Sequence, residues 1–133
     1  MSIGTILIAA SLMLSAASAV FFARSRNSSV QFQINVARKL YIASSILIFF
    51  AFLLLLSAIL NNEFQYLYVH DNSSLSMGVA YKIAALWAGH EGSYLVWIFI
   101  MNIMGLLLLR SERENNDIVM TVIAVVQALM LVI

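Results

Sequence analysis

Cysteine and proline are absent from this 133-residue sequence, and charged residues make up only 10% of it. Without cysteine the chain can form neither disulfides nor thiolate metal sites, and it offers no cysteine nucleophile. Its seven lysine and arginine residues and its net charge of +1 provide no clustered basic surface, which excludes nucleic acid as a partner. The sequence also contains no glycine-rich phosphate loop, so nothing in it supports ATP chemistry.

Hydrocarbon is abundant instead: 63% of the residues are hydrophobic and the mean hydropathy is +0.98. This composition is typical of an integral membrane protein, and runs of about 20 apolar residues are long enough to cross a bilayer. We predict an all-α fold, a polytopic membrane helix bundle that forms a single membrane domain over residues 1–133. It has four transmembrane helices, at 3–23, 40–60, 92–109 and 118–133, and a partly helical external segment at 61–93 between the second and the third.

The basic residues predict the orientation of these crossings. Six of them fall on one side of the predicted helices and only Lys82 on the other, so the positive-inside rule places both termini outside. The six are Arg24, Arg26, Arg38, Lys39, Arg110 and Arg113. The first apolar run could instead be a secretory signal with a cleavage site at 17–19, but it lacks a basic leader and is followed by arginines. The fourth run is short for a crossing, which suggests the N-terminal part of a larger protein.

Residues 87–97 bring two tryptophans, two glycines, a histidine and a glutamate into this apolar sequence. Gly89 and Gly92 allow the backbone to turn tightly or to approach another surface closely, because glycine has no Cβ. We expect the resulting bend to lie at the mouth of the third crossing. The candidate cofactor-binding residues there are Trp87, Gly89, His90, Glu91, Gly92, Ser93 and Trp97, together with Lys82.

His90 and Glu91 leave several roles open. They could form an acid–base pair, or His90 could be an axial haem ligand oriented by the carboxylate, or a structural histidine bonded within the turn. Neighbours in sequence face each other only if residues 89–92 are irregular, and a histidine without a second ligand at metal spacing argues against a metal site. Trp87 and Trp97 could stack on a porphyrin or anchor the segment at the membrane interface.

Other polar residues in the external segment carry further expectations. A helix is predicted from Leu75 to Trp87 with Ser74 as its N-cap. Lys82 falls on the apolar face of this helix, so its ammonium must snorkel, form a pair or face an anionic ligand. His70, next to Asp71, is expected to be solvated.

A few polar residues interrupt the predicted membrane helices. Ser11, Ser15 and Ser18 share one helical face, which suits close packing or hydrogen bonding to a neighbouring helix. Asn102 and Gln127 have similar predicted depths in the third and fourth crossings. Because an amide in hydrocarbon needs a partner, we predict that they face each other or share a polar neighbour.

The run from Tyr81 to Trp97, YKIAALWAGHEGSYLVW, resembles the N-terminal region of the CcmF-type cytochrome c haem lyases. Residues 61–64, 66–69 and 72–73 resemble the external segment of that family in the same order. The resemblance implies a multi-pass protein of the bacterial cytoplasmic membrane or the mitochondrial inner membrane. Such a protein receives haem from a carrier protein on the outer face and presents it for thioether attachment to apocytochrome c.

The resemblance also implies what this chain lacks. The family's tryptophan-rich haem-binding segment and its haem-ligating histidines lie beyond residue 133. Haem is therefore expected to be bound mainly by parts absent from this chain, which is not expected to be active as an enzyme alone, and no catalytic residue is assigned. The implied partners are membrane lipid, the remainder of the haem lyase, the haem carrier protein and apocytochrome c.

A different class of function is a small membrane subunit of an ion- or proton-translocating complex. In that case His90 and Glu91 would relay protons as ionisable groups within the membrane. The acidic residues of this sequence fall in loops or at helix mouths, whereas the helix centres contain only neutral Asn102 and Gln127. This distribution favours a haem-handling role in cytochrome c biogenesis.

Overall fold

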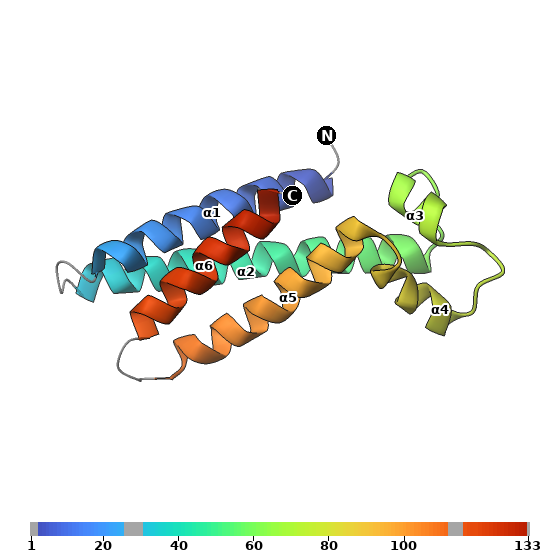
Figure 1. Cartoon of the computed structure of the whole chain (residues 1–133). Coiled ribbons are helices and arrows are strands. Elements are labelled where there is room, and N and C mark those ends of the chain that lie inside the picture. The colour runs from blue at the N-terminus through green and yellow to red at the C-terminus, as the bar shows by residue number, and fades with distance from the viewer. Residues whose placement is uncertain (1–2, 26–30, 112–115, 133) are drawn as a thin grey trace.

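The computed structural model describes residues 3–25, 31–111 and 116–132, which form helices and their connections without any strand (Figure 1). The predicted all-α class is thus confirmed for the described residues. The four long helices are α1 (Ile3–Ser25), α2 (Gln31–Leu60), α5 (His90–Leu109) and α6 (Asn116–Val132). Between α2 and α5 lie the short helices α3 (Leu67–Asn72) and α4 (Val79–Ala84) and a 3-10 turn, η1 (Ala85–Trp87).

Three of the described helices, α1, α2 and α5, are long and apolar enough to cross a membrane. The fourth long helix, α6, is also apolar but has 17 residues. The chain is a multi-pass membrane protein. Helix α2 begins at Gln31 rather than at Leu40, because hydropathy marks the apolar run while Arg38 and Lys39 are good helix formers that extend the helix beyond it.

The long helices form a bundle in which α2 runs the whole length (Figure 1). Helix α1 packs along α2 and α6, while α5 packs against both α2 and α6. The 30 residues of α2 extend about 45 Å, which exceeds a hydrocarbon core of roughly 30 Å. In Figure 1 its C-terminal end projects beyond α1 and α6, where it supports the segment that follows.

Small hydroxyl side chains bring α1 close to its neighbours. Ser15 Oγ donates a hydrogen bond to Ala124 O of α6 at 3.0 Å, and Ser18 Oγ donates to Ala37 O of α2 at 2.9 Å. Both serines are buried, as is Ser11. The predicted role of this face in helix packing and hydrogen bonding is confirmed, because its hydroxyls reach backbone carbonyls of two neighbouring helices.

The predicted pairing of Asn102 with Gln127 is wrong, because both amides contact α2 instead. Asn102 Oδ1 accepts a hydrogen bond from Ser45 Oγ at 2.6 Å, whereas Gln127 Nε2 donates to Ser44 Oγ at 3.3 Å. The two serines are adjacent in α2 and form hydrogen bonds with different helices, Ser45 with α5 and Ser44 with α6. Matching depth alone could not reveal this, because depth does not show that α2 provides a polar partner for each amide.

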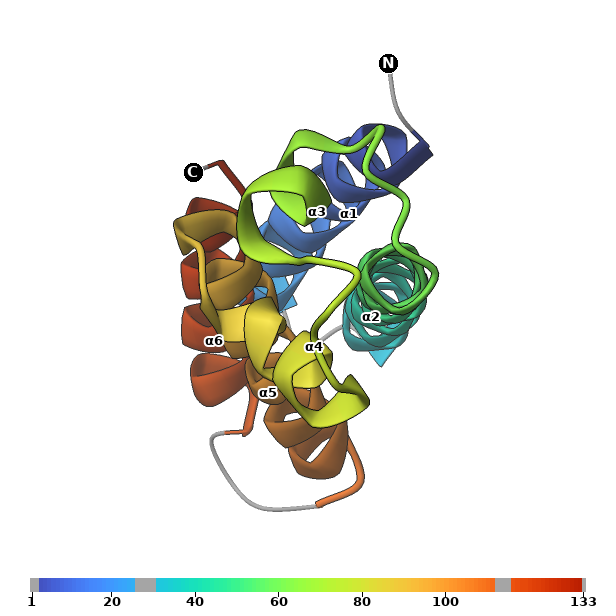
Figure 2. The ribbon, with the colours of Figure 1, turned by 90° about the vertical axis from the view of Figure 1, so that its right-hand side faces the viewer.

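Residues 61–89, which we call the cap, lie around the C-terminal end of α2, with α3 and α4 beside it (Figure 2). Buried apolar side chains from α2, α3, η1 and α5 join the cap to the bundle. They are Ala58, Ile59, Val69, Ala85, Leu86 and Val96. The cap thus shares a small apolar core with the ends of α2 and α5.

The helix predicted from Leu75 to Trp87 is shorter than expected. Its first turn starts at Val79 after Gly78, which takes the N-cap position in place of Ser74, and residues 85–87 form the 3-10 turn. The Ser74 hydroxyl hydrogen-bonds to the Ser76 hydroxyl at 3.1 Å, so it does not cap a helix. The separate helix α3 was not predicted, because its six residues are too few to show a helical period.

Candidate functional site

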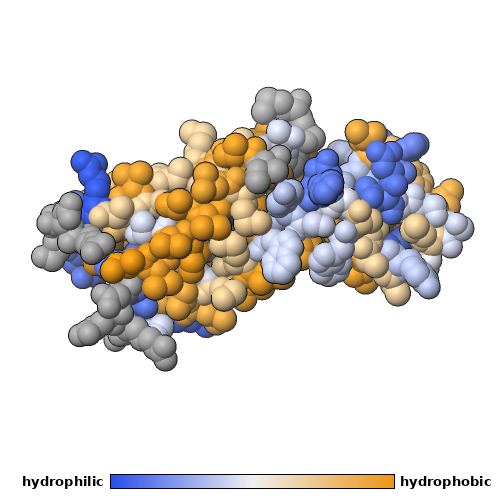
Figure 3. All heavy atoms as spheres, in the orientation of Figure 1, coloured by the Kyte–Doolittle hydropathy of each residue, from blue (hydrophilic) through white to orange (hydrophobic). Residues whose placement is uncertain are grey.

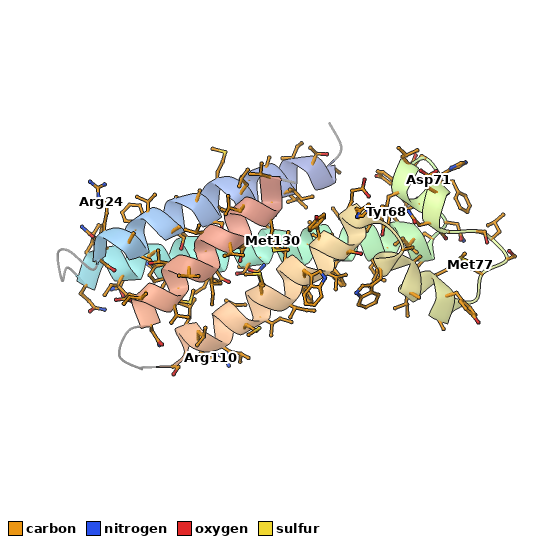
Figure 4. All side chains as sticks on the ribbon, in the orientation of Figure 1. Arg24, Tyr68, Asp71, Met77, Arg110 and Met130 are labelled. Carbon is orange, nitrogen blue, oxygen red and sulfur yellow. The ribbon has the colours of Figure 1, made fainter. Side chains whose placement is uncertain are left out.

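Tyr68 of α3 connects the cap to the first turn of α5. Its phenol oxygen lies 3.0 Å from Ala85 O and 3.2 Å from Leu86 O, to either of which it can donate, and it accepts a hydrogen bond from Gly89 N at 3.2 Å. Figure 4 shows Tyr68 beside the N-terminal end of α5. One side chain therefore fixes the turn in which the candidate residues 87–93 lie.

The Tyr68 phenol stays protonated in this position. Burial raises its pKa above the ordinary value, and the Glu91 carboxylate raises it further, while backbone N–H groups of Gly89 and Gly92 lower it. A neutral phenol can donate to a carbonyl and accept from an N–H at the same time. Both kinds of hydrogen bond are present, so the contact suits the protonated form.

The two glycines of the segment permit the close approach of Tyr68. A Cβ at Gly89 would lie 2.7 Å from Tyr68 Cε2, and a Cβ at Gly92 would overlap both the Tyr68 hydroxyl and the backbone oxygen of Leu86. No described glycine has a positive φ. Of the two uses that the sequence left open, close approach is confirmed at these positions, and a left-handed turn is not needed.

His90 and Glu91 are the first two residues of α5, after Gly89 at the N-cap. Neighbours on a regular helix point in different directions, so the irregular bend that an acid–base pair would require is absent here. Both side chains are exposed. Glu91 lies in the first turn, where the positive end of the helix dipole favours a carboxylate.

Ser93 and the tryptophans complete this end of α5. Ser93 Oγ lies 2.9 Å from Gly89 O and 3.2 Å from Trp87 O, so its hydroxyl can donate to either carbonyl. Trp87 is 55% exposed and Trp97 is 58% exposed. Their ring faces remain available to lipid or to a planar ligand, which are the two roles considered for them.

Lys82 is only 8% exposed, and its ammonium donates a hydrogen bond to Asn62 Oδ1 at 2.6 Å. Of the three possibilities predicted for it, pairing is the observed one, with a neutral amide as the partner. Within the described residues no carboxylate lies within ion-pair distance of Lys82. The positive charge of Lys82 is therefore not balanced by a carboxylate among these residues.

Asn62 explains how this charge is tolerated. It has a φ of 57° and follows the last turn of α2, where Asn62 N donates to Ile59 O at 3.3 Å and Glu63 N donates to Ala58 O at 2.9 Å. These two bonds form a Schellman motif, which needs a left-handed residue such as asparagine. The ammonium therefore lies at the C-terminal end of a 30-residue helix, where the dipole favours a positive charge.

The described histidines are dispersed. His70 Nδ1 lies 3.0 Å from Asp71 Oδ1 on an exposed surface, in agreement with the solvated position expected. Neither His70 nor His90 lines the pocket beside α3 or the groove between α2 and α5. Among the residues that the structure describes there is also no group of three possible metal ligands. These residues do not fit an enclosed haem or metal site.

Sequence reasoning missed Tyr68 and Asn62, although both organise the candidate segment. In the sequence both fall in the predicted external segment at 61–93, without a partner assigned to either. Their partners lie about 20 positions away in the sequence, at Gly89 and Lys82. The glycine pair was a signal of close approach, but nothing in the sequence identified which side chain would fill the space.

No family model matches the chain. It is 40% identical over 76 residues to the cytochrome c-type biogenesis protein CcmF of Escherichia coli, covering 56% of this chain and 12% of that protein. It is 31% identical over 90 residues to the probable cytochrome c-type biogenesis protein NrfE of the same organism, covering 68% of this chain and 16% of the relative. CycK of Bradyrhizobium diazoefficiens is 32% identical over 71 residues, 53% of this chain and 11% of its own length.

A solved structure of the cytochrome c haem lyase CcmF has a similar fold. The TM-score is 0.88 with 23% sequence identity, and the match covers 96% of this chain and 22% of the other. The chain thus spans about a tenth to a fifth of the length of the proteins that it matches. The resemblance to CcmF-type proteins, stated from the motif, is confirmed.

Proposed function

We propose that this chain, a relative of the CcmF-type cytochrome c biogenesis proteins in sequence and in fold, serves cytochrome c maturation as part of a haem lyase. The observation that carries the proposal is the agreement of two likenesses over one chain: the sequence likeness to biogenesis proteins and the fold likeness to a haem lyase. In this role the bundle holds the cap, and the cap holds residues 87–97 on the outer surface, where haem and apocytochrome c would meet.

The proposed topology has four crossings and both termini outside, with residues 61–93 as the external segment. Arg24 and Arg110 lie at the end of the bundle opposite Asp71 in the cap, as the positive-inside rule requires (Figure 4). Because these 133 residues contain no cysteine, the labelling of a single introduced cysteine measures the accessibility of that position alone. An impermeant thiol reagent applied to intact cells should label Ser76→Cys and leave Gln31→Cys unlabelled; the reverse pattern contradicts the topology.

The haem itself would be bound mainly by the rest of the lyase, since the described residues provide no enclosed pair of axial ligands. The proposed contribution of this chain is a surface with the exposed Trp87 before α5 and the exposed Trp97 two turns into it, and with His90 and Glu91 between them in the sequence. Planar aromatic faces of this kind stack on planar ligands. The remainder of the lyase, a haem carrier protein, apocytochrome c and membrane lipid are the proposed partners.

The test is covalent cytochrome formation in cells that carry the gene in its natural place. Replacing both tryptophans, Trp87→Leu with Trp97→Leu, should lower haem-stained c-type cytochrome several-fold on denaturing gels, because stacking between aromatic rings is worth about 0.5–1.5 kcal/mol per pair. The matched control is Tyr81→Leu, which removes another exposed aromatic ring of the cap and should leave the stain unchanged. An unchanged stain in the double variant at equal protein level contradicts the proposal.

A further inference from the structure

A pocket of about 500 Å³ lies between the start of α1, the end of α2, α3 and the start of α5, and it shares Glu91 with the Trp87–Trp97 surface. This volume is in the range of ligand-binding pockets, about 300–1,000 Å³. Its floor is formed by apolar side chains of the three long helices, among them Ile8, Leu55 and Leu95. One part of any occupant must therefore be apolar.

The rim of this pocket carries three carboxylates, those of Glu63, Asp71 and Glu91. They come from the turn after α2, from α3 and from the start of α5. Asp71 is 3.0 Å from the exposed His70 ring, but Glu91 forms no ion pair or side-chain hydrogen bond with the described residues. The rim can therefore accept positive charge from an occupant.

No basic side chain offsets these carboxylates among the described residues that line the pocket. Asp71 lines the pocket, and Arg24 and Arg110 lie at the opposite end of the bundle from it (Figure 4). The buried ammonium of Lys82 is bonded to Asn62. Three carboxylates at the rim repel a phosphate group, and the His70 ring beside one of them already contacts Asp71, which disfavours a phospholipid headgroup.

We propose that this pocket binds a basic, amphipathic segment of a polypeptide, with apolar side chains on the floor and lysine or arginine at the rim. Negative charges around an apolar cavity attract a basic segment and disfavour a neutral or acidic one. The inference rests on the proposed function only for its setting, since a site of cytochrome maturation must receive a polypeptide. The binding itself is measurable without maturation.

The probe is a short fluorescent peptide that alternates leucine with lysine, added to the full chain in nanodiscs of zwitterionic lipid, with empty nanodiscs as a blank. Fluorescence anisotropy should show saturable binding that weakens as salt rises, because rim charges are screened. A matched peptide with glutamate in place of lysine should bind at least tenfold more weakly. Equal binding of the two peptides contradicts the proposal.

The double variant Asp71→Asn with Glu91→Gln should bind the basic peptide roughly fivefold more weakly, as expected for two exposed charge contacts. Both positions are exposed, so the fold should be unaffected. The matched control is Asp117→Asn, which removes a carboxylate from α6 at the other end of the bundle and should keep wild-type affinity. Wild-type affinity in the double variant overturns the proposal.

Two further results separate the possible explanations. Stoichiometric phosphatidylethanolamine in the purified wild-type chain, lost in the double variant, would identify a lipid site and overturn the inference. Loss of peptide binding in the double variant supports it whatever the level of c-type cytochrome. Conversely, an unaffected cytochrome level in the Trp87 and Trp97 variants would contradict the proposed function and leave the peptide measurement standing.

Discussion

The bundle and the cap hold their polar groups in different ways. In the bundle, small hydroxyls such as Ser15 and Ser18 each donate one hydrogen bond to a carbonyl of the neighbouring helix. In the cap, two long side chains carry most of the tertiary hydrogen bonding: Tyr68 contacts the turn before α5, and Lys82 contacts the end of α2. Hydrophilic residues gather around α3, while hydrophobic residues cover α6 (Figure 3).

This difference follows from the surroundings of each region. A hydrogen bond between two membrane helices contributes only about 0.6 kcal/mol on average, so the stability of the bundle depends on many such contacts. The cap is too small to bury much apolar surface and depends on a few side chains with several partners. Single substitutions should therefore affect the cap more strongly than the bundle.

The largest effect is expected at Gly92 of α5. In Gly92→Ala the new Cβ would overlap the Tyr68 hydroxyl and the backbone oxygen of Leu86, and a backbone atom cannot move aside cheaply. Overpacking of this kind costs about 1–3 kcal/mol or more and should detach the cap from α5. Limited proteolysis of residues 61–89 in detergent should speed up, and the thermal midpoint should fall.

The control for this substitution is Gly78→Ala, also in the cap. The nearest side-chain atom to a Cβ there is Tyr81 Cδ2 at 4.0 Å, and its φ of −65° suits alanine. Proteolysis should stay close to the wild-type rate, because the new Cβ meets no other side chain closer than 4.0 Å. Equal damage from Gly78→Ala and Gly92→Ala would show that the cap tolerates no alanine, and that the Tyr68 contact is not the cause.

An intermediate effect is expected at Asn62, the partner of Lys82. Asn62→Gly keeps the left-handed backbone that the end of α2 needs but removes the oxygen that binds the buried ammonium. An ammonium left without its partner costs about 1–3 kcal/mol. Adding Lys82→Met should recover part of this loss, because the unpartnered charge is then gone.

Thermal unfolding of the two single variants and the double variant measures this coupling. Lys39→Met serves as the control, because Lys39 is exposed near the other end of α2 and its removal should change stability by less than about 0.5 kcal/mol. Additive losses at Asn62 and Lys82 would contradict a direct interaction. The polar contacts of the cap would then be less important than its apolar core.

The bundle could be predicted from the sequence more fully than the cap. Hydropathy located the apolar runs of α1, α2 and α5, because burial in hydrocarbon depends on composition over about 20 residues. The serine face of α1 was likewise visible from its helical spacing. The start of α2 at Gln31 and the short helix α3 were missed, since neither has an apolar run that marks it.

The candidate segment was identifiable, but its support was not. Trp87, His90 and Glu91 stand out in an apolar sequence, and the glycine pair indicated a close approach. Which side chain approaches is a tertiary property: Tyr68 meets Gly89 only because α2 projects far enough to place α3 over the start of α5. The pocket rim is likewise a tertiary property that the sequence does not show, because its carboxylates come from separate parts of the chain.

The smallest effects should come from the two amides of the bundle, and they should differ in sign. Asn102 is satisfied at both ends: Oδ1 accepts from Ser45, and Nδ2 donates to Ile98 O at 2.9 Å. Gln127, with 0% exposure, donates one bond of 3.3 Å to Ser44, and its Oε1 has no partner among the described residues. The first amide stabilises the bundle, and the second carries the penalty of a buried carbonyl without a hydrogen bond.

Asn102→Leu should therefore lower the free energy of unfolding by about 0.6–1.7 kcal/mol, the range found for hydrogen bonds between membrane helices. Gln127→Met, of similar shape, gives up one long bond and also removes the unpartnered oxygen, so stability should stay the same or rise by up to about 1 kcal/mol. Ser44 keeps its hydrogen bond to Ser11 O at 3.0 Å in that variant, so no new unpaired donor arises. Unfolding in mixtures of a mild detergent and dodecyl sulfate measures the free energy of unfolding of both variants. Equal losses would mean that Gln127 Oε1 has a partner in the membrane, and that the bundle holds both amides in the same way.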